Sequence, residues 1–498
     1  MTRRRIQEYR RNLECDPGIN TELLLEIQQY LKGERGEARS VILSFDGMSA
    51  DDGIFTKFGS GELSGMEDLG DLVTYTREKM DATEIKVAKE CMQLMVTSVT
   101  GKFRVPIGYY MVQSATAGLI AEMVDRALID LDKINVHVRV VIPDGAPEHR
   151  AWQKKVACYV DENPMWHGDA NAAKFKVGMK HPNYPFSRDK MVILMSDPVH
   201  LVKKLVRNLH SSGFEKGKSK LLLKDGEHIH WKQLVHAFEQ DQKLPNPIAQ
   251  KITRAHLDRS SFTGLKTRYS TQLMSASNQR SVQKHSKLDE KPNKQLLQYM
   301  FLADRYIDIM NSGKQRASWF GEAKAHLNHP IRESSDQRLR QLAQTVWWFD
   351  QWHAENERLP AASPAERKKR FISEELYYDI RLAIRGFIMV ADILCETQTP
   401  VIPRLYNQDC VENHFSLLRA SAGARTHIKA HEMPSSQSAV LVQTSRGGLV
   451  GSGNVTADHN SVDENIAMSL RSRHVVRKDR AKRRKIGQDL FAAAGIVL

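Results

Sequence analysis

The sequence predicts an α/β protein in which a mixed β-sheet is interrupted by a large, mainly α-helical region. Three observations lead to this expectation. Short apolar runs, typical of buried strands, recur through residues 41–210. Residues 211–395 carry instead the 3.6-residue periodicity of amphipathic helices. A further helical segment follows at 407–421, so the chain is expected to return to the sheet after the interruption.

The elements of the sheet region can be placed from apolar runs and turn residues. VILSFDGM at 41–48 is a continuous apolar run that ends in an acid, and VHVRVVIPDG at 136–145 has the same form. Glycines between two short runs predict a hairpin around 59–61. Helices are expected at 20–33, 117–131 and 200–209, and further strands at 92–99, 105–112 and 191–197.

The rest of the chain divides into helices and a polar end. Helical periodicity predicts helices at 230–242, 295–310, 339–356 and 375–394. In the last helix, 407–421, Asn407 is the expected N-cap, and Val411, Phe415 and Leu418 should face the core. Beyond about residue 431 the chain is rich in Ser and Gly, which predicts a disordered basic tail.

The 498 residues carry a net charge of +14. Such a surplus favours a polyanionic partner such as DNA or RNA, or an anionic membrane surface; the alternative is a basic tail on an otherwise neutral protein. No apolar run is long enough to span a bilayer. Of these partners we expect DNA, and no membrane. The five cysteines are scattered, which favours a reducing compartment without disulfides.

Besides the first eleven residues, which carry five arginines, two basic segments are the candidates for contact with phosphates. The first is the helix and loop at 200–220, with Lys203, Lys204 and Arg207. The second is the run 471–485, in which nine of fifteen residues are Lys or Arg, among them Arg477, Lys478, Arg483 and Arg484. This run is typical of nuclear-targeting or phosphate-binding segments, although it could also be a solvated tail. Neither segment has the composition of a base-reading element, so contacts should be mainly with the backbone of DNA.

Three acids could carry chemistry. Asp46 and Asp144 each follow a strongly apolar strand, and an acid there emerges at the edge of a buried sheet. Glu412 lies on the last helix, beside its apolar stripe. Two-metal phosphoryl transfer requires carboxylates that hold a pair of cations, and magnesium prefers such oxygen ligands. The alternatives are ordinary turn or cap residues for the two aspartates and a solvated helix face for Glu412.

Read together, these segments resemble the P-element transposases and their relatives with a THAP domain. SFDGMSADDGIFTKFGSGELSGMEDLG is similar to the first catalytic block of that family, and FRVPIGYYMV and VVIPDGAPEHRAW are similar to the strands that follow. MSDPVHLVKKLVRNL resembles the family's DPPHLIK signature, IHWKQLVHAFEQDQ the start of its GTP-binding insertion, and NQDCVENHFSLLRASAG the block with the catalytic glutamate. The matches keep the family's order over about residues 15–425.

The resemblance implies an RNase H-like core and a DDE-type transposase that cleaves and transfers DNA strands. Asp46, Asp144 and Glu412 take the positions of the catalytic acids, which would hold two Mg²⁺ ions. It also implies a GTP-binding insertion. We further expect Asp409, three residues before Glu412, to contact the nucleotide where the insertion meets the core, the basic run 471–485 to direct the protein to the nucleus, and the chain to form a homo-oligomer. The expected domains are an N-terminal helical arm (1–40), the first part of the core (41–210), the insertion (211–395), the final core helix (396–430) and the tail (431–498).

The sequence departs from the family pattern in several places. Asp-Gly-Met replaces Asp-Glu-Met in the first block, Pro147-Glu148-His149 follows Asp-Gly-Ala, and Ala422-Gly423 replaces a glycine pair. The roughly 40 residues before the first strand lack the Cys/His set of a THAP zinc finger, so the chain is expected to lack that module. The alternative function is therefore a domesticated, catalytically inactive DNA-binding or regulatory protein with the same fold. An RNase H-like nuclease acting on RNA fits less well, because of the large insertion.

Overall fold

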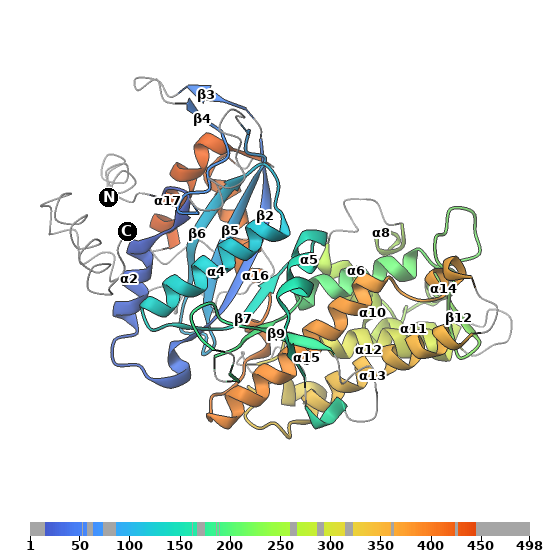
Figure 1. Cartoon of the computed structure of the whole chain (residues 1–498). Helices are drawn as coiled ribbons and strands as arrows, with labels where there is room; N and C mark the ends of the chain where they lie inside the picture. The colour runs from blue at the N-terminus through green and yellow to red at the C-terminus, as the bar shows by residue number, and fades with distance from the viewer. Residues whose placement is uncertain are drawn as a thin grey trace, which may run out of the picture.

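A central mixed sheet and a bundle of helices lie side by side in the computed structural model (Figure 1). The structure describes residues 15–51, 53–56, 63–72, 86–161, 163–166, 175–185, 187–188, 190–258, 266–285, 293–313, 322–359, 363–423 and 427–444. The expected α/β fold, with a mixed sheet followed by a mainly helical region, is therefore confirmed.

Nine strands of the described residues form the sheet, in the order β1-β6-β5-β2-β7-β10-β9-β8, with β13 added beside the end of β2. β2 is central: it pairs antiparallel with β5 and parallel with β7, and β7 pairs parallel with β10. The strands are β1 (Gly18–Ile19), β2 (Ser40–Asp51), β5 (Glu90–Ser98), β6 (Arg104–Val112), β7 (His137–Pro143), β8 (Tyr159–Val160), β9 (Lys176–Met179), β10 (Val192–Leu194) and β13 (Ile428–Lys429). Two hairpins lie outside this sheet, β3 (Phe55–Thr56) with β4 (Leu63–Ser64) and β11 (Leu222–Lys224) with β12 (Glu227–Ile229). The first is the expected hairpin, although its turn lies outside the described residues.

Helices cover both faces of the sheet. Successive residues of a strand point to opposite faces, and the strands are apolar on both, so both faces must be buried. Met92 and Leu94 of β5 belong to the core beneath α4 (Ala117–Lys133) and α2 (Thr21–Tyr30). Cys91 and Met95 belong instead to a second cluster with Phe415, on α16 (Asp409–Ser421), and with residues of α17 (Met433–Thr444). α5 (Pro147–Val156) follows β7 and packs against α4.

α17 corrects the expectation that the chain is disordered from residue 431 onward. Met433 and Val440 are fully buried against α16, and Gln437 donates to Gln93 of β5. The segment is poor in large apolar residues, but Met433 and Val440 pack in the cluster with α16 and β5, and Leu441 belongs to the main core of the sheet. The basic run 471–485, with Arg477, Lys478, Arg483 and Arg484, lies outside the described residues.

The helical part begins with α6, directly after β10, and its last long helix returns to the sheet. The helices are α6 (Pro198–His210), α7 (Trp231–Asp241), α8 (Arg254–Leu257), α10 (Thr267–Met274), α11 (Ala276–His285), α12 (Lys294–Met310), α13 (Gln337–Arg358), α14 (Pro364–Arg370) and α15 (Glu374–Glu396). None of the helices in the described part of the chain is long and apolar enough to cross a bilayer.

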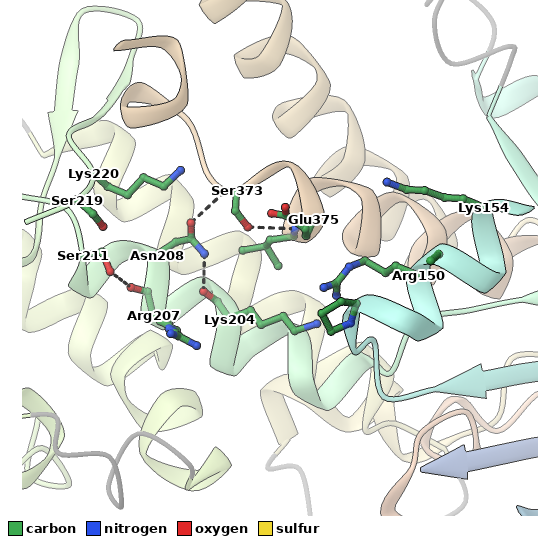
Figure 2. Close-up of a pocket in the computed structure, with 13 residues that line it drawn as sticks. Arg150, Lys154, Lys204, Arg207, Asn208, Ser211, Ser219, Lys220, Ser373 and Glu375 are labelled. Atoms are coloured by element: carbon green, nitrogen blue, oxygen red, sulfur yellow. Dashed lines mark hydrogen bonds between the residues drawn. The ribbon is translucent and has the colours of Figure 1, made fainter. Parts of the chain in front are cut away.

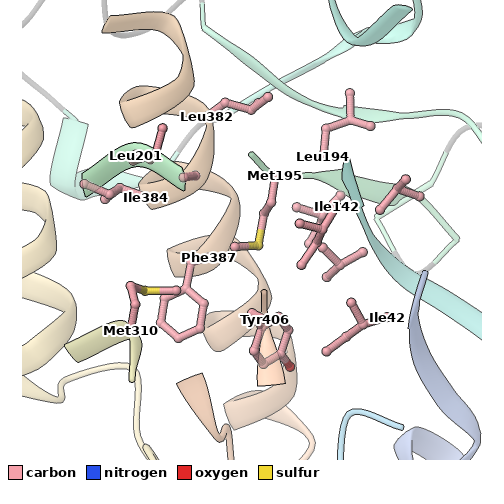
Figure 3. Close-up of a cluster of buried hydrophobic side chains, with 14 of the residues drawn as sticks. Ile42, Ile142, Leu194, Met195, Leu201, Met310, Leu382, Ile384, Phe387 and Tyr406 are labelled. Carbon is pink, nitrogen blue, oxygen red and sulfur yellow. The ribbon is translucent and has the colours of Figure 1, made fainter. Parts of the chain in front are cut away.

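α15 joins the helical part to the sheet. α15 is buried on most sides, and its Leu382, Ile384 and Phe387 belong to the same hydrophobic core as Met195, which follows β10, and Tyr406 (Figure 3). Gly386 allows this contact, because a Cβ atom there would lie 2.5 Å from the carbonyl oxygen of Leu194. The sheet and the helical part therefore share one hydrophobic core.

Candidate active site

Asp46 and Asp144 lie side by side on neighbouring parallel strands. Phe45 of β2 pairs with Pro143 of β7, so the next residue on each strand is an aspartate. Asp144 follows the end of β7 as expected, whereas Asp46 does not end its strand. β2 continues to Asp51, because β5 pairs with it through Ser49 and β13 pairs with Ala50 and Asp51. Asp46 is therefore held in a central strand at the point where its β7 neighbour stops.

The electrostatic environment distinguishes the two aspartates. Burial and the charge of Asp144 raise the pKa of Asp46, whose Oδ1 accepts a hydrogen bond from the backbone N–H of Gly47. Burial also acts to raise the pKa of Asp144, but contact with His149 outweighs it and leaves that pKa low. His149 Nδ1 lies 2.6 Å from Asp144 Oδ1, which also accepts from the N–H of Ala146 at 2.7 Å. Two carboxylates that repel each other at a sheet edge are suited to a bound cation.

Glu412 approaches the same sheet edge through a histidine. Its side chain is about half exposed (47%), and its Oε1 lies 3.4 Å from Nε2 of His200 on α6. The other ring nitrogen of His200, Nδ1, lies 2.6 Å from Oδ2 of the buried Asp197. Burial lowers the pKa of His200, but contact with Asp197 outweighs it and raises that pKa. The structure thus places a carboxylate–imidazole–carboxylate series between α6 and α16.

Gln408 connects the helix of Glu412 to both strands that carry the aspartates. Its side-chain Nε2 donates to the carbonyl oxygens of Phe45 at 2.7 Å and Ile142 at 3.0 Å. Its backbone N–H donates to Asp197 Oδ1 at 3.1 Å. Gln408 is also the residue that precedes α16, which begins at Asp409. Asn407 is therefore not the N-cap that the sequence predicts; its side chain exchanges hydrogen bonds with Asp409 instead.

Asp409 lies on the side of α16 that faces Asp197. Burial raises its pKa to about 6, and the charges of Asp197 and Glu412 act in the same direction. One of its oxygens, Oδ2, accepts a hydrogen bond from Asn407 at 3.0 Å. The expected role of Asp409 in nucleotide binding remains a prediction.

The acids do not by themselves form a complete metal centre. Within the described ranges, no group of three or more His, Cys, Asp or Glu side chains is arranged to hold a metal ion. The pair Asp46 and Asp144 fits a cation, because the two carboxylates lie together and raise the pKa of Asp46. Glu412 is turned toward His200. The roles of Asp46, Asp144 and Glu412 as catalytic metal ligands therefore remain predictions.

The predicted phosphate-binding residues of α6 differ in their surroundings. Arg207 is exposed, and Lys203 is partly exposed near His200. Lys204 points toward the protein: its Nζ donates to Asp379 at 2.8 Å and to the carbonyl oxygen of Gly145 at 3.2 Å.

Sequence reasoning missed four side chains of this site: His149, Asp197, His200 and Gln408. Each lies inside one of the quoted motifs, in APEHRAW, MSDPVH or NQDCVE. The only signal was that these motifs are dense in polar residues, and spacing could not show which partner each would meet.

A mixed sheet with aspartates on two central parallel strands and an acidic helix beside them defines an RNase H-like fold. Comparisons with known proteins agree. Residues 15–157 match the family described as TNP-like, RNase H N-terminal domain. The fold is similar to the Drosophila P element transposase in its strand transfer complex, with a TM-score of 0.65 and 14% identity over 88% of this chain and 84% of that chain.

The particular relatives follow from the same comparisons. The chain is 25% identical over 268 residues to the DNA transposase THAP9 of Homo sapiens. That match covers 51% of this chain and 27% of THAP9, so the chain spans about a quarter of its curated relative. The resemblance to P-element-type transposases and the RNase H-like fold are thus confirmed.

Proposed function

We propose that this chain is a DDE-type transposase, or a domesticated derivative of one, that cleaves and transfers DNA strands. The observation that carries the proposal is that Asp46 and Asp144 directly follow the last residue pair of β2 and β7, with the Glu412 helix anchored to both strands by Gln408. The relation to P element and THAP9 transposases supports DNA as the substrate.

Asp46 and Asp144 would hold Mg²⁺, and Glu412 would complete the set by turning from His200. Two such ions would activate the attacking oxygen and stabilise the leaving oxygen of a phosphodiester. The chain's own contribution is positional. His149 and the N–H of Ala146 fix one oxygen of Asp144, and Gln408 fixes the position of α16 relative to the two strands.

Metal-dependent nicking of a labelled DNA duplex tests this function. Asp46→Asn and Asp144→Asn should abolish nicking while the protein remains folded, because each removes one carboxylate charge with little change in shape. Asp51→Asn is the matched control: Asp51 is exposed on the same strand and should be dispensable. Nicking that survives in both aspartate variants would refute the proposed site.

The alternative is a catalytically inactive DNA-binding or regulatory protein. One observation favours it, namely that Glu412 contacts His200 and completes no three-acid cluster within the described ranges. Wild-type protein that binds DNA but shows no nicking with Mg²⁺ or Mn²⁺ would establish this alternative.

The family resemblance further leads us to propose GTP binding by the helical part, with Asp409 as a contact. A ligand that binds only the folded state raises its stability by RT ln(1 + [L]/Kd). GTP should therefore raise the melting temperature more than ATP does, and Asp409→Asn should reduce the difference. Equal shifts with both nucleotides would exclude guanine specificity.

A homo-oligomer and a nuclear location are proposed on the same basis, together with phosphate contacts by the run 471–485. Light scattering at several concentrations tests the first. Imaging of the full chain and of a chain shortened at residue 470 tests the second.

A further inference from the structure

A cationic cavity of about 710 Å³ lies beside the candidate active site, between α5, α6 and the start of α15. Five basic side chains line it: Arg150, Lys154, Lys204, Arg207 and Lys220. Figure 2 shows them around the first turn of α15, at Ser373 and Glu375. Five basic side chains around one cavity favour an anionic ligand.

The positive charge of the cavity is only partly neutralised by the protein. Arg150 and Lys204 share the buried carboxylate of Asp379, at 3.2 Å and 2.8 Å. Lys220 donates to two backbone carbonyl oxygens, those of Lys368 and Phe371, which carry no full charge. Among the described residues, neither Lys154 nor Arg207 forms an ion pair with a carboxylate. The cavity therefore has more cations than acids to balance them.

Polar groups without net charge complete the wall. The Asn208 side chain accepts from the N–H of Ser373 and donates to the carbonyl of Lys204, so it fixes α6 against α15. Ser373 caps α15 by accepting from the N–H of Leu376. Because α15 has 23 residues, the positive end of its dipole adds to the field in the cavity. Glu375, an acid at this helix start, has a low pKa because of backbone hydrogen bonding there and the nearby Arg150 and Lys154.

The cavity is continuous with the loop that carries Asp144. Lys204 Nζ and an Arg150 guanidinium N–H both donate to the carbonyl oxygen of Gly145, the residue after Asp144. A DNA strand with one phosphate at Asp46 and Asp144 would carry its neighbouring phosphates past this loop.

We propose that this cavity binds backbone phosphates of the DNA strand that enters the candidate active site. The proposal rests on the proposed function for the identity of that strand. Lys154 and Arg207 supply the exposed contacts, while Asp379 holds Arg150 and Lys204 in place at the wall. The contacts are with phosphates, so they should not depend on base sequence.

The test uses the double variant Lys154→Glu/Arg207→Glu, because neither side chain forms an ion pair within the described residues. The control is Lys155→Glu/Lys180→Glu, which makes the same change in net charge at two exposed lysines outside the cavity. Lys155 is the neighbour of Lys154 on α5. Equal melting temperatures of both variants and wild type establish that they are folded.

Binding of a labelled duplex is measured over a series of KCl concentrations without divalent cations. Each phosphate contact contributes about 0.9 to the slope of log K against log salt concentration, so the cavity variant should lose about 2 from the slope. The control should keep the wild-type slope. A cavity variant with the control's slope and affinity would overturn the proposal.

Tripolyphosphate distinguishes a strand from a free phosphate ligand. If it stabilises the wild type but not the cavity variant, while DNA binding is equal in both, the cavity takes a free ligand and the proposal is wrong. Asp46→Asn should bind DNA with the wild-type slope. If the cavity variant has the same salt slope as the wild type, the cavity proposal is wrong, whatever the nicking assay shows. If Asp46→Asn and Asp144→Asn nick DNA as well as the wild type does, the proposed function is wrong, whatever the salt slope shows.

Discussion

The side-chain amide of Gln408 lies 2.7 Å from the carbonyl oxygen of Phe45, the residue before Asp46. The same nitrogen lies 3.0 Å from the carbonyl oxygen of Ile142, two residues before Asp144. One buried amide thus fixes the distance between two strands and the helix of Glu412. The relative positions of the three acids depend on this amide as much as on the strands.

Gln408→Ala should lower the free energy of unfolding by about 1–3 kcal/mol, because two buried carbonyl groups lose a donor. Urea unfolding measures the change. Gln233→Ala is the control: Gln233 is also buried and donates to Asn293 at 2.7 Å, but in the helical part. Both variants should lose stability, but only Gln408→Ala should lose nicking at a temperature where both are folded. Equal nicking in the two variants would show that Gln408 only stabilises the fold.

Asp197→Ala should destabilise the protein by about 2 kcal/mol or more. Asp197 is buried, caps α6 by accepting from the N–H of His200 at 3.0 Å, and accepts from Gln408. An exposed cap alone contributes about 1 kcal/mol. Ser363→Ala, which removes such a cap from α14, provides the comparison in chemical denaturation. Equal losses in the two variants would contradict the additional role of Asp197 in holding Gln408.

Asp379→Ala should cost about 3 kcal/mol, because it leaves two partly buried cations, Arg150 and Lys204, without their carboxylate. Asp130→Ala is the control, since Asp130 also lies between two bases, Arg126 and Lys133, but these belong to its own helix, and Arg126 is more exposed than Arg150. That variant should lose 1 kcal/mol or less. Thermal unfolding measures the loss of stability in each variant. Similar losses would show that solvent screens the charges around Asp379 as it screens an ion pair on the surface.

Gly386→Ala should lower stability by about 1–3 kcal/mol, although alanine is the better helix former by roughly 1 kcal/mol. The added Cβ atom would meet the carbonyl oxygen of Leu194 at 2.5 Å and side-chain atoms of Met195 at 2.7 Å. α15 would have to move away from β10. Calorimetry on the purified variant measures the change, and a rise in melting temperature would show that the contact between α15 and the sheet is looser than the structure has it.

Asp304→Asn should stabilise the protein increasingly as the pH rises from 4 to 7. Burial, and then the charge of Asp308, raise the pKa of Asp304 from 3.8 to about 7. Ionisation of Asp304 therefore costs more free energy in the folded protein than in the unfolded chain. This destabilisation is absent below about pH 4 and complete above about pH 7. Unfolding free energies should agree at pH 4 and differ by about 4 kcal/mol at pH 7.5, since each unit of pKa corresponds to about 1.4 kcal/mol. A difference that does not change with pH would contradict the raised pKa.

Much of the fold follows from local patterns. The run at 41–48 becomes part of β2, and the spacing at 117–131 becomes α4, because burial of an apolar face depends on periodicity that is visible in the chain. Asp144 could be placed after its strand, since the apolar run stops there. The end of β2 could not be placed, because it is set by pairing with β5 and β13, which are distant in the sequence.

The sequence by itself determined the class of fold, the order of its parts and the acids that are candidates for catalysis. The tertiary structure decided which groups meet. His200 reaches Glu412, and Gln408 joins two strands more than 260 residues before it in the chain. Periodicity records which face of an element is buried, but a hydrogen bond between distant residues is set by how the elements pack.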